Sequence, residues 1–300
     1  MFVSRTIVDL NSGKRRKLSI KMAAAHPSAA PIHVIQRVWE RIAPLRLAEK
    51  SWDNVGVIIE APSPDSSHKQ VLLTIDLTTA YVSPSKSKAR LIKFSSPDIQ
   101  SAQVRLAQYP LEASLLRLSA HGISVFTPHT SLDATPDGLN SWLVKPFETN
   151  TSSSKPITHS EHIQGFEGAG IGKIVKLTKS LRTSRIVEVV KEHLSLKHVQ
   201  LATPREDPEI NSIAVCAGSG ASVLKGVQAD LLLTGEMSHH EVLAFVAAGQ
   251  SLILCNHTNT ERPYLSQVLR PRLEDELNAE SDSGWEVMVS KVDAEPLRTV

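Results

Sequence analysis

Two histidine–carboxylate pairs with one shared spacing are the residues of this sequence best suited to chemistry. His129 precedes Asp133 by four positions, and His257 precedes Glu261 by four. Where such a stretch forms one helical turn, both groups project to the same side. Imidazole and carboxylate ligands together suit borderline or hard divalent metals such as Zn, Mn, Fe or Ni. The repeated spacing therefore favours a metal site.

Each pair also has a purely structural interpretation. His129 follows Pro128 in a turn, and Asp133 would then cap the next segment. Glu261 would interact favourably with the positive end of a helix that begins near Pro263. We favour metal binding because the two pairs occupy equivalent places in the predicted topology.

Two further polar clusters lie between the pairs. Glu236, His239 and His240 could be ligands, general bases or groups that orient a ligand through its other ring nitrogen. Capping of the following helix is their structural alternative. The turn Gly218, Ser219, Gly220 could offer backbone N–H groups to a phosphate, although such a turn more often only connects a strand to a helix.

All four clusters directly follow predicted strands. These are the apolar runs at residues 123–126, 213–216, 231–234 and 252–255. In open α/β sheets, ligands bind beyond the carboxyl ends of the strands. The order of the elements therefore predicts one shared site.

The pattern of apolar residues in the rest of the chain predicts alternating helices and strands, which indicates an α/β fold with two lobes. An amphipathic helix is predicted from Ile32 to Glu49, with a break near Pro44. A polar, proline-bounded stretch at residues 149–164 predicts a linker. The expected boundaries are a leader at 1–30, a first lobe at 31–148 and 250–300, and a second lobe at 165–249. Additional strands are expected at residues 57–59, 71–75, 175–177, 199–203 and 285–289, and helices at 112–120, 184–194, 221–227, 240–248 and 263–277.

The charge distribution limits the classes of partner. The net charge of +2 conceals six basic residues and one acidic residue within the first 21, so that this segment carries +5 and the remainder −3. A mildly acidic body disfavours direct nucleic-acid binding. No apolar run is long enough for a membrane-spanning helix.

The basic, acid-poor start is typical of a mitochondrial presequence. A disordered tail, or translation from Met22, is the alternative. Cys216 and Cys255 lie in apolar runs and form no CxxC pair, which favours buried thiols in a reducing compartment. We therefore expect a cytoplasmic protein, with the mitochondrion as the alternative.

Together these motifs resemble the GTP cyclohydrolase I type 2-like family, also called the NIF-three-like family. The resemblance covers residues 32–296. The motifs that carry it, in chain order, are residues 52–56 (WDNVG), 128–134 (PHTSLDA), 138–143 (GLNSWL), 216–220 (CAGSG), 230–240 and 257–262 (HTNTER).

The resemblance implies two interlinked α/β lobes with mixed sheets, a two-metal centre in the cleft between them, and a ring-shaped homohexamer. The implied ligands are Asp133, His257 and Glu261, with His129 close by. Members usually supply another histidine after an early strand, and here Ser96 stands at that position. A hydroxyl is a far poorer ligand than imidazole, so either this chain holds only one metal or the segment 81–109 is a misread stretch of sequence.

Two functions follow. The family label suggests a metal-dependent hydrolase or cyclohydrolase acting on a purine nucleotide, with Glu261 or Glu236 carrying the proton. The alternative is a non-catalytic, regulatory member that interacts with transcription factors through protein contacts.

Overall fold

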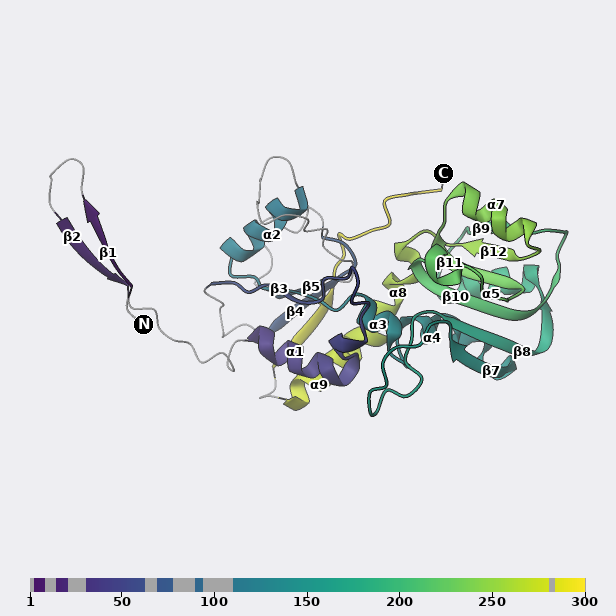
Figure 1. Ribbon diagram of the computed structural model, residues 1–300, viewed down its shortest axis with the longest axis horizontal. Coiled ribbons are helices and arrows are strands. Elements are labelled where there is room, and N and C mark those ends of the chain that lie inside the picture. Colours follow the sequence, from purple (N-terminus) through teal and green to yellow (C-terminus); the bar gives the residue numbers. More distant parts are fainter. Residues whose placement is uncertain are drawn as a thin grey trace.

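The computed structural model describes residues 31–62, 69–77, 110–280 and 284–299, together with three strands at residues 3–8, 15–20 and 90–93. β1 (Val3–Val8) and β2 (Arg15–Ile20) pair antiparallel within the segment expected to be a leader. The body contains a five-stranded and a six-stranded sheet, which confirms the mixed α/β class (Figure 1). Ser96 lies outside the described residues.

The five-stranded sheet has the order β13-β4-β5-β6-β3. Its members are β13 (Glu286–Val289), β4 (Gln70–Thr74), β5 (Arg90–Lys93), β6 (Val125–Thr127) and β3 (Gly56–Ile59). The first four are parallel, and only β3 runs antiparallel, at the edge. The parallel strands end on one side of the sheet, where the loops that carry Asp76 and His129 begin.

Helices cover both faces of this sheet (Figure 1). α1 (Pro31–Ile42) and α9 (Arg270–Glu280) pack on one face, and Ile35, Trp39 and Phe126 belong to that core. α2 (Pro110–Ala120) packs on the other face, where Leu115 contacts a smaller cluster. The covered faces explain why the central strands are apolar on both sides.

The six-stranded sheet has the order β7-β8-β10-β11-β12-β9. β10 (Glu209–Ser219), β11 (Leu231–Glu236) and β12 (Ser251–Leu254) are parallel. The other three strands run antiparallel to their neighbours and are β7 (Thr151–Pro156), β8 (Lys173–Arg182) and β9 (Gln200–Ala202).

Alternation along β10 assigns the helices to the faces of this sheet. Ile213 and Val215 belong to the core that includes α5 (Thr183–Leu194). Ala214 and Cys216 face α6 (Ala221–Leu224) and α7 (His239–Ala247). Cys216 and Cys255 are buried and unpaired, and burial raises the pKa of both thiols.

Short helices join the two sheets into one core. α3 (Thr130–Ala134) and α4 (Leu139–Val144) lead into the 3₁₀ helix η4 (Lys145–Asn150). Asn140 bridges the lobes, because its amide donates to the Asp133 carbonyl at 3.1 Å and accepts from the Ala217 N–H at 3.0 Å. Among the residues described, no helix is long and apolar enough to cross a membrane.

Two expected boundaries differ from the observed topology. The linker expected at residues 149–164 contains β7. The polar side chains of β7 are typical of a loop, but its backbone pairs with β8. β12, within the part assigned to the first lobe at 250–300, pairs with β11 in the six-stranded sheet. Hydrogen bonding at a sheet edge leaves no hydrophobic signal in the sequence.

Two expected helices are interrupted. α1 ends at Ile42, and after Pro44 the chain continues as the 3₁₀ turn η2 (Leu45–Leu47). The helix expected at 263–277 is divided into α8 (Arg262–Tyr264), the π turn η6 (Leu265–Leu269) and α9. Pro271 has no N–H to donate to the preceding turn, which accounts for a wide turn at that place.

Candidate functional site

Loops from both sheets meet at one site. His129 follows β6, His257 follows β12, Glu236 ends β11, and Gly218 lies in the last residues of β10. The structure thus brings together groups from all four predicted clusters. The loops share the site because each follows the carboxyl end of a parallel strand.

Asp53 holds His129 in place. His129 Nδ1 donates to Asp53 Oδ1 at 2.8 Å, and the other carboxylate oxygen accepts from the backbone N–H and the hydroxyl of Thr130. The Asp53 side chain is fully buried. Burial opposes its ionisation, but the bonds from His129 and Thr130 prevail and lower the pKa of Asp53. Sequence reasoning missed this role, although the motif at residues 52–56 contains Asp53.

His129 has a φ of 33°, an unfavourable backbone conformation for a residue with a side chain. Strain of this kind persists only where the surroundings fix the conformation. The hydrogen bonds that Asp53 accepts from His129 and Thr130 provide that restraint. The Trp52 ring also packs edge-on against the imidazole, with ring centroids 5.6 Å apart.

Glu236 plays the corresponding part for His257. His257 Nδ1 lies 2.7 Å from Glu236 Oε1, and its Nε2 lies 3.5 Å from Glu261 Oε1. Burial disfavours the imidazolium, but Glu261 and Glu236 outweigh it and raise the pKa of His257. Both histidines are therefore held at Nδ1 by a carboxylate, which leaves Nε2 for a ligand.

Asp133 and Glu261 are the two carboxyl groups that burial affects most. Burial raises the pKa of Asp133 to about 6 and that of Glu261 to about 8. The charge of Asp53 also raises the pKa of Asp133, and Asp133 in turn raises that of Glu261, whereas His129 and His257 oppose the rise. Glu261 exposes only 14% of its side chain. Glu261 therefore keeps its proton at neutral pH in the metal-free site, and a bound cation would displace it.

The cavity at the centre of the site is narrow. His129, Asp133, Glu261 and Tyr264 line about 20 Å³ of space, which is room for about one water-sized group. Among the described residues, no three His, Cys, Asp or Glu side chains already converge as a set of metal ligands. The imidazole and carboxylate groups of this site are donors that suit a divalent metal. Because they do not yet converge on one point, these side chains would have to move toward a bound ion.

The glycine turn packs closely against this site. A Cβ on Gly218, whose φ is +62°, would lie 2.7 Å from Glu261 Oε1 and 2.9 Å from His257 Nε2. The Gly218 N–H donates to Thr260 Oγ1, and the Gly220 N–H donates to Thr234 Oγ1. Two of the three N–H groups of this turn are therefore used within the protein, and the phosphate role of Gly218, Ser219 and Gly220 stays a prediction. The glycines also allow the close packing.

His239 and His240 lie at the start of α7, where their rings contact each other at a centroid distance of 5.5 Å. No hydrogen bond among the described residues joins them to His129 or His257. Glu236, which the sequence suggested as a proton carrier, is the group that orients His257. Asp76, at the end of β4, also raises the pKa of His257 and Glu261, and sequence reasoning did not single it out.

The sequence matches the family Duf34/NIF3 (NGG1p interacting factor 3) over residues 31–296. It is 37% identical to "Protein NIF3 homolog" from Schizosaccharomyces pombe, across 89% of this chain and 97% of that protein. It is 36% identical to "NGG1-interacting factor 3" from Saccharomyces cerevisiae, across 89% and 96%.

Solved structures share the fold. The "Bacillus cereus protein related to NIF3" superposes with a TM-score of 0.71 at 15% identity, across 89% of this chain and 98% of that one. Reduced HcgD from Methanocaldococcus jannaschii gives 0.66 at 21% identity, across 86% and 96%. At these identities the likeness establishes the architecture alone.

The raised pKa values predict how stability depends on pH in the metal-free protein. Asp133, Glu261, His129 and His257 all have raised pKa values, so the folded state binds more protons than the unfolded state and stability falls as pH rises. The window extends from about pH 4 to the Glu261 pKa of about 8. The lowered pKa of Asp53 acts in the opposite direction, but only near and below its ordinary value of 3.8.

With EDTA present, we expect the free energy of unfolding to drop by roughly 2 kcal/mol between about pH 5.5 and about pH 8.5. Glu261→Gln should reduce that slope, because the amide has no proton to lose. Urea titrations at both pH values measure the change. A wild-type protein that is equally stable, or more stable, at the higher pH would contradict the assignment.

Proposed function

Because the chain belongs to the Duf34/NIF3 family, we propose that it binds divalent metal through Asp133, His257 and Glu261, with His129 as a further ligand. The observation that carries the proposal is the pair of imidazoles, each held at Nδ1 by a carboxylate. Metal-binding histidines almost always have such a partner, which fixes the ring and makes the free nitrogen a better donor.

The buried carboxylates supply the driving force. An uncompensated carboxylate is costly in a site sheltered from water, and a neutral one must keep its proton. A divalent cation would offset the charge of Asp133 and Glu261 together. It would also release the protons that their raised pKa values retain. Zn, Mn, Fe and Ni suit this mixture of nitrogen and oxygen donors, in one or two sites.

A hydrolase or cyclohydrolase acting on a purine nucleotide is the activity we propose for this site. A bound divalent ion would make a coordinated water acidic enough to attack at neutral pH. Glu261 is the proton carrier we propose, because burial raises its pKa to about 8 in the metal-free site, so that it can take up a proton whenever it is not bound to the ion. Glu236 keeps the His257 ring oriented, and Gly218 allows the loops to close on this pair.

An interaction role is the second candidate. A relative is named "NGG1-interacting factor 3", which suggests a transcription-related protein partner that the chain contacts without nucleic acid.

α7 offers a separate surface, for self-association, because none of its nine residues is buried and Leu243 exposes 52% of its surface. A second copy of the chain is the partner we propose for this helix, as part of a homo-oligomer of hexamer size.

Metal content tests the first proposal. We expect the purified protein to retain divalent metal after dialysis, as measured by inductively coupled plasma mass spectrometry. His257→Gln should lose it, because one imidazole ligand is removed. Glu236→Gln should weaken affinity about tenfold or more, because the ring loses its orienting partner. His240→Gln is the matched control, since His240 is an exposed histidine on α7, and it should retain metal.

Metal retention in His257→Gln equal to that in His240→Gln would contradict the ligand assignment. Formate release from GTP by the metal-loaded protein separates the two functions. Turnover that disappears in Glu261→Gln supports hydrolysis, whereas stoichiometric metal without turnover favours the binding role. The metal content of Ser96→His, measured by the same mass spectrometry, tests whether the departure at position 96 limits metal binding.

Self-association through α7 predicts that Leu243→Glu lowers the oligomeric state. A charge at the centre of an apolar interface remains unpaired on association and opposes it. Light scattering during size-exclusion chromatography measures the mass, with Leu201→Glu, an exposed leucine on β9, as the control. An unchanged oligomer in Leu243→Glu would exclude α7 from the interface.

A further inference from the structure

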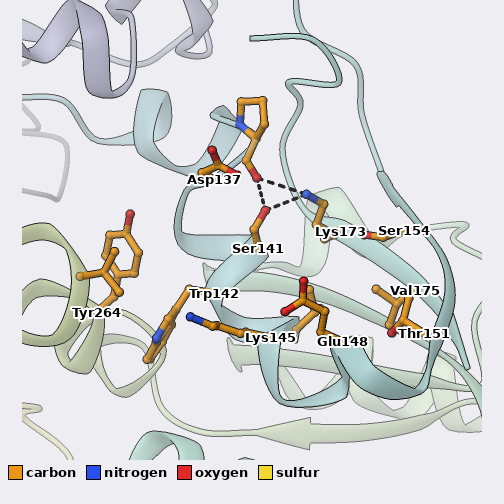
Figure 2. Close-up of a pocket in the computed structure, with 13 residues that line it drawn as sticks. Asp137, Ser141, Trp142, Lys145, Glu148, Thr151, Ser154, Lys173, Val175 and Tyr264 are labelled. Atoms are coloured by element: carbon orange, nitrogen blue, oxygen red, sulfur yellow. Dashed lines mark hydrogen bonds between the residues drawn. The ribbon is translucent and has the colours of Figure 1, made fainter. Parts of the chain in front are cut away.

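A second cavity lies outside the site formed by His129 and His257. It encloses about 380 Å³ between α4, η4 and the outer strands of the six-stranded sheet (Figure 2). Lys173 of β8 and Ser141 of α4 form one part of its wall, and Tyr264 of α8 forms another. A volume of this size is in the range of small-molecule sites.

Lys173 is a half-buried cation that forms no close ion pair within the part of the chain that the structure describes. Its Nζ donates to Ser141 Oγ at 2.7 Å and to the Pro136 carbonyl at 3.3 Å. Both acceptors are neutral, and no carboxylate of the described residues is in ion-pair contact with Nζ. An ammonium has three donors, so one is left for a ligand. Burial lowers the pKa of Lys173, opposed in part by Asp137.

The hydroxyl of Ser141 fixes the direction of this amine. Ser141 Oγ donates to the Pro136 carbonyl and accepts from Lys173, as the dashed lines of Figure 2 show. The Ser141 hydroxyl and the Pro136 carbonyl hold Nζ at the wall of the cavity without neutralising it. A carboxylate or phosphate placed there would form a charge-assisted hydrogen bond and supply the missing negative charge.

The remaining walls suit an apolar or aromatic body. Trp142 and Tyr264 contribute rings, and Val144, Val175 and Val268 contribute aliphatic surface. Trp142 is held by stacking on His193, with ring centroids 4.2 Å apart, and by a hydrogen bond between His193 Nε2 and the Trp142 carbonyl at 3.0 Å. Rigid aromatic walls around a fixed charge are typical of small-molecule sites.

The other charged residues of the cavity limit the ligand's charge. Asp137 and Glu148 are carboxylates, and Lys145 is a second cation. The two carboxylates would repel a polyanion such as a nucleoside triphosphate. A molecule with one anionic group is repelled less by these carboxylates while it still pairs with Lys173.

We propose that this cavity binds a small organic anion, with its one carboxylate or phosphate group on Lys173 and Ser141 and its apolar body against Trp142 and the valines. This site is separate from the metal ligands, although Tyr264 lines both cavities and forms a shared wall. The proposal goes beyond the metal chemistry and does not depend on it.

Isothermal titration calorimetry with benzoate and phenyl phosphate tests the site, with EDTA present to exclude metal-bound anions. These probes carry the same ring with a carboxylate or a phosphate, so that they distinguish the two head groups. We expect one of them to bind and the neutral analogue benzamide not to bind. Lys173→Met should weaken binding at least about tenfold, and Ser141→Ala less, because a charge-assisted bond contributes more than the group that orients it.

Lys176→Met is the matched control, because Lys176 is an exposed lysine on the same strand, and it should bind like wild type. Glu261→Gln should also bind like wild type, which separates this site from the metal ligands. Failure of wild type to bind either probe at millimolar concentration would overturn the proposal. Equal affinity in Ser141→Ala, Lys173→Met and Lys176→Met would overturn it as well, and so would binding lost in Glu261→Gln.

Discussion

The fold places two carboxyl groups, Asp133 and Glu261, where water reaches them poorly, and the rest of the site compensates for that placement. A buried carboxylate must be paired, protonated or bound to a cation. The two imidazoles provide partial pairing, and the pKa values of about 6 and about 8 show that pairing alone is incomplete. The same imbalance is the physical basis of the metal site that we propose.

The surrounding structure keeps these groups close together. The Gly218 turn reaches within van der Waals distance of His257 and Glu261, a proximity that no larger residue permits. Beyond Glu261, Arg262 forms an ion pair with the buried Asp293 at 2.6 Å, and Asp293 also accepts from the Ile75 N–H of the five-stranded sheet. The C-terminal segment thereby fixes the loop after β12 against the strand that ends near Asp76.

The sequence predicted most of the elements well, because buried parallel strands and amphipathic helices leave strong apolar periodicity. It placed His129, Asp133, His257 and Glu261 in one shared site by spacing and topology, although the structure draws them from two sheets. It could not reveal the partners of the two imidazoles, because Asp53 is 76 positions from His129 and Glu236 is 21 from His257. Nor could it show that hydroxyls occupy the N–H groups of Gly218 and Gly220, or that Lys173 forms no close ion pair with any described residue, since both depend on tertiary contacts.

Proton release on metal binding tests the central claim most directly, namely that Glu261, whose pKa is raised to about 8, retains a proton near neutrality which a cation displaces. Calorimetric titration of the apo protein with Zn²⁺ or Mn²⁺ at about pH 7, repeated in buffers of different ionisation enthalpy, counts the protons released. Our account predicts a release of about one proton or more per metal, with a smaller release in Glu261→Gln. Metal binding with no proton release, or with the same release in the variant, would contradict it.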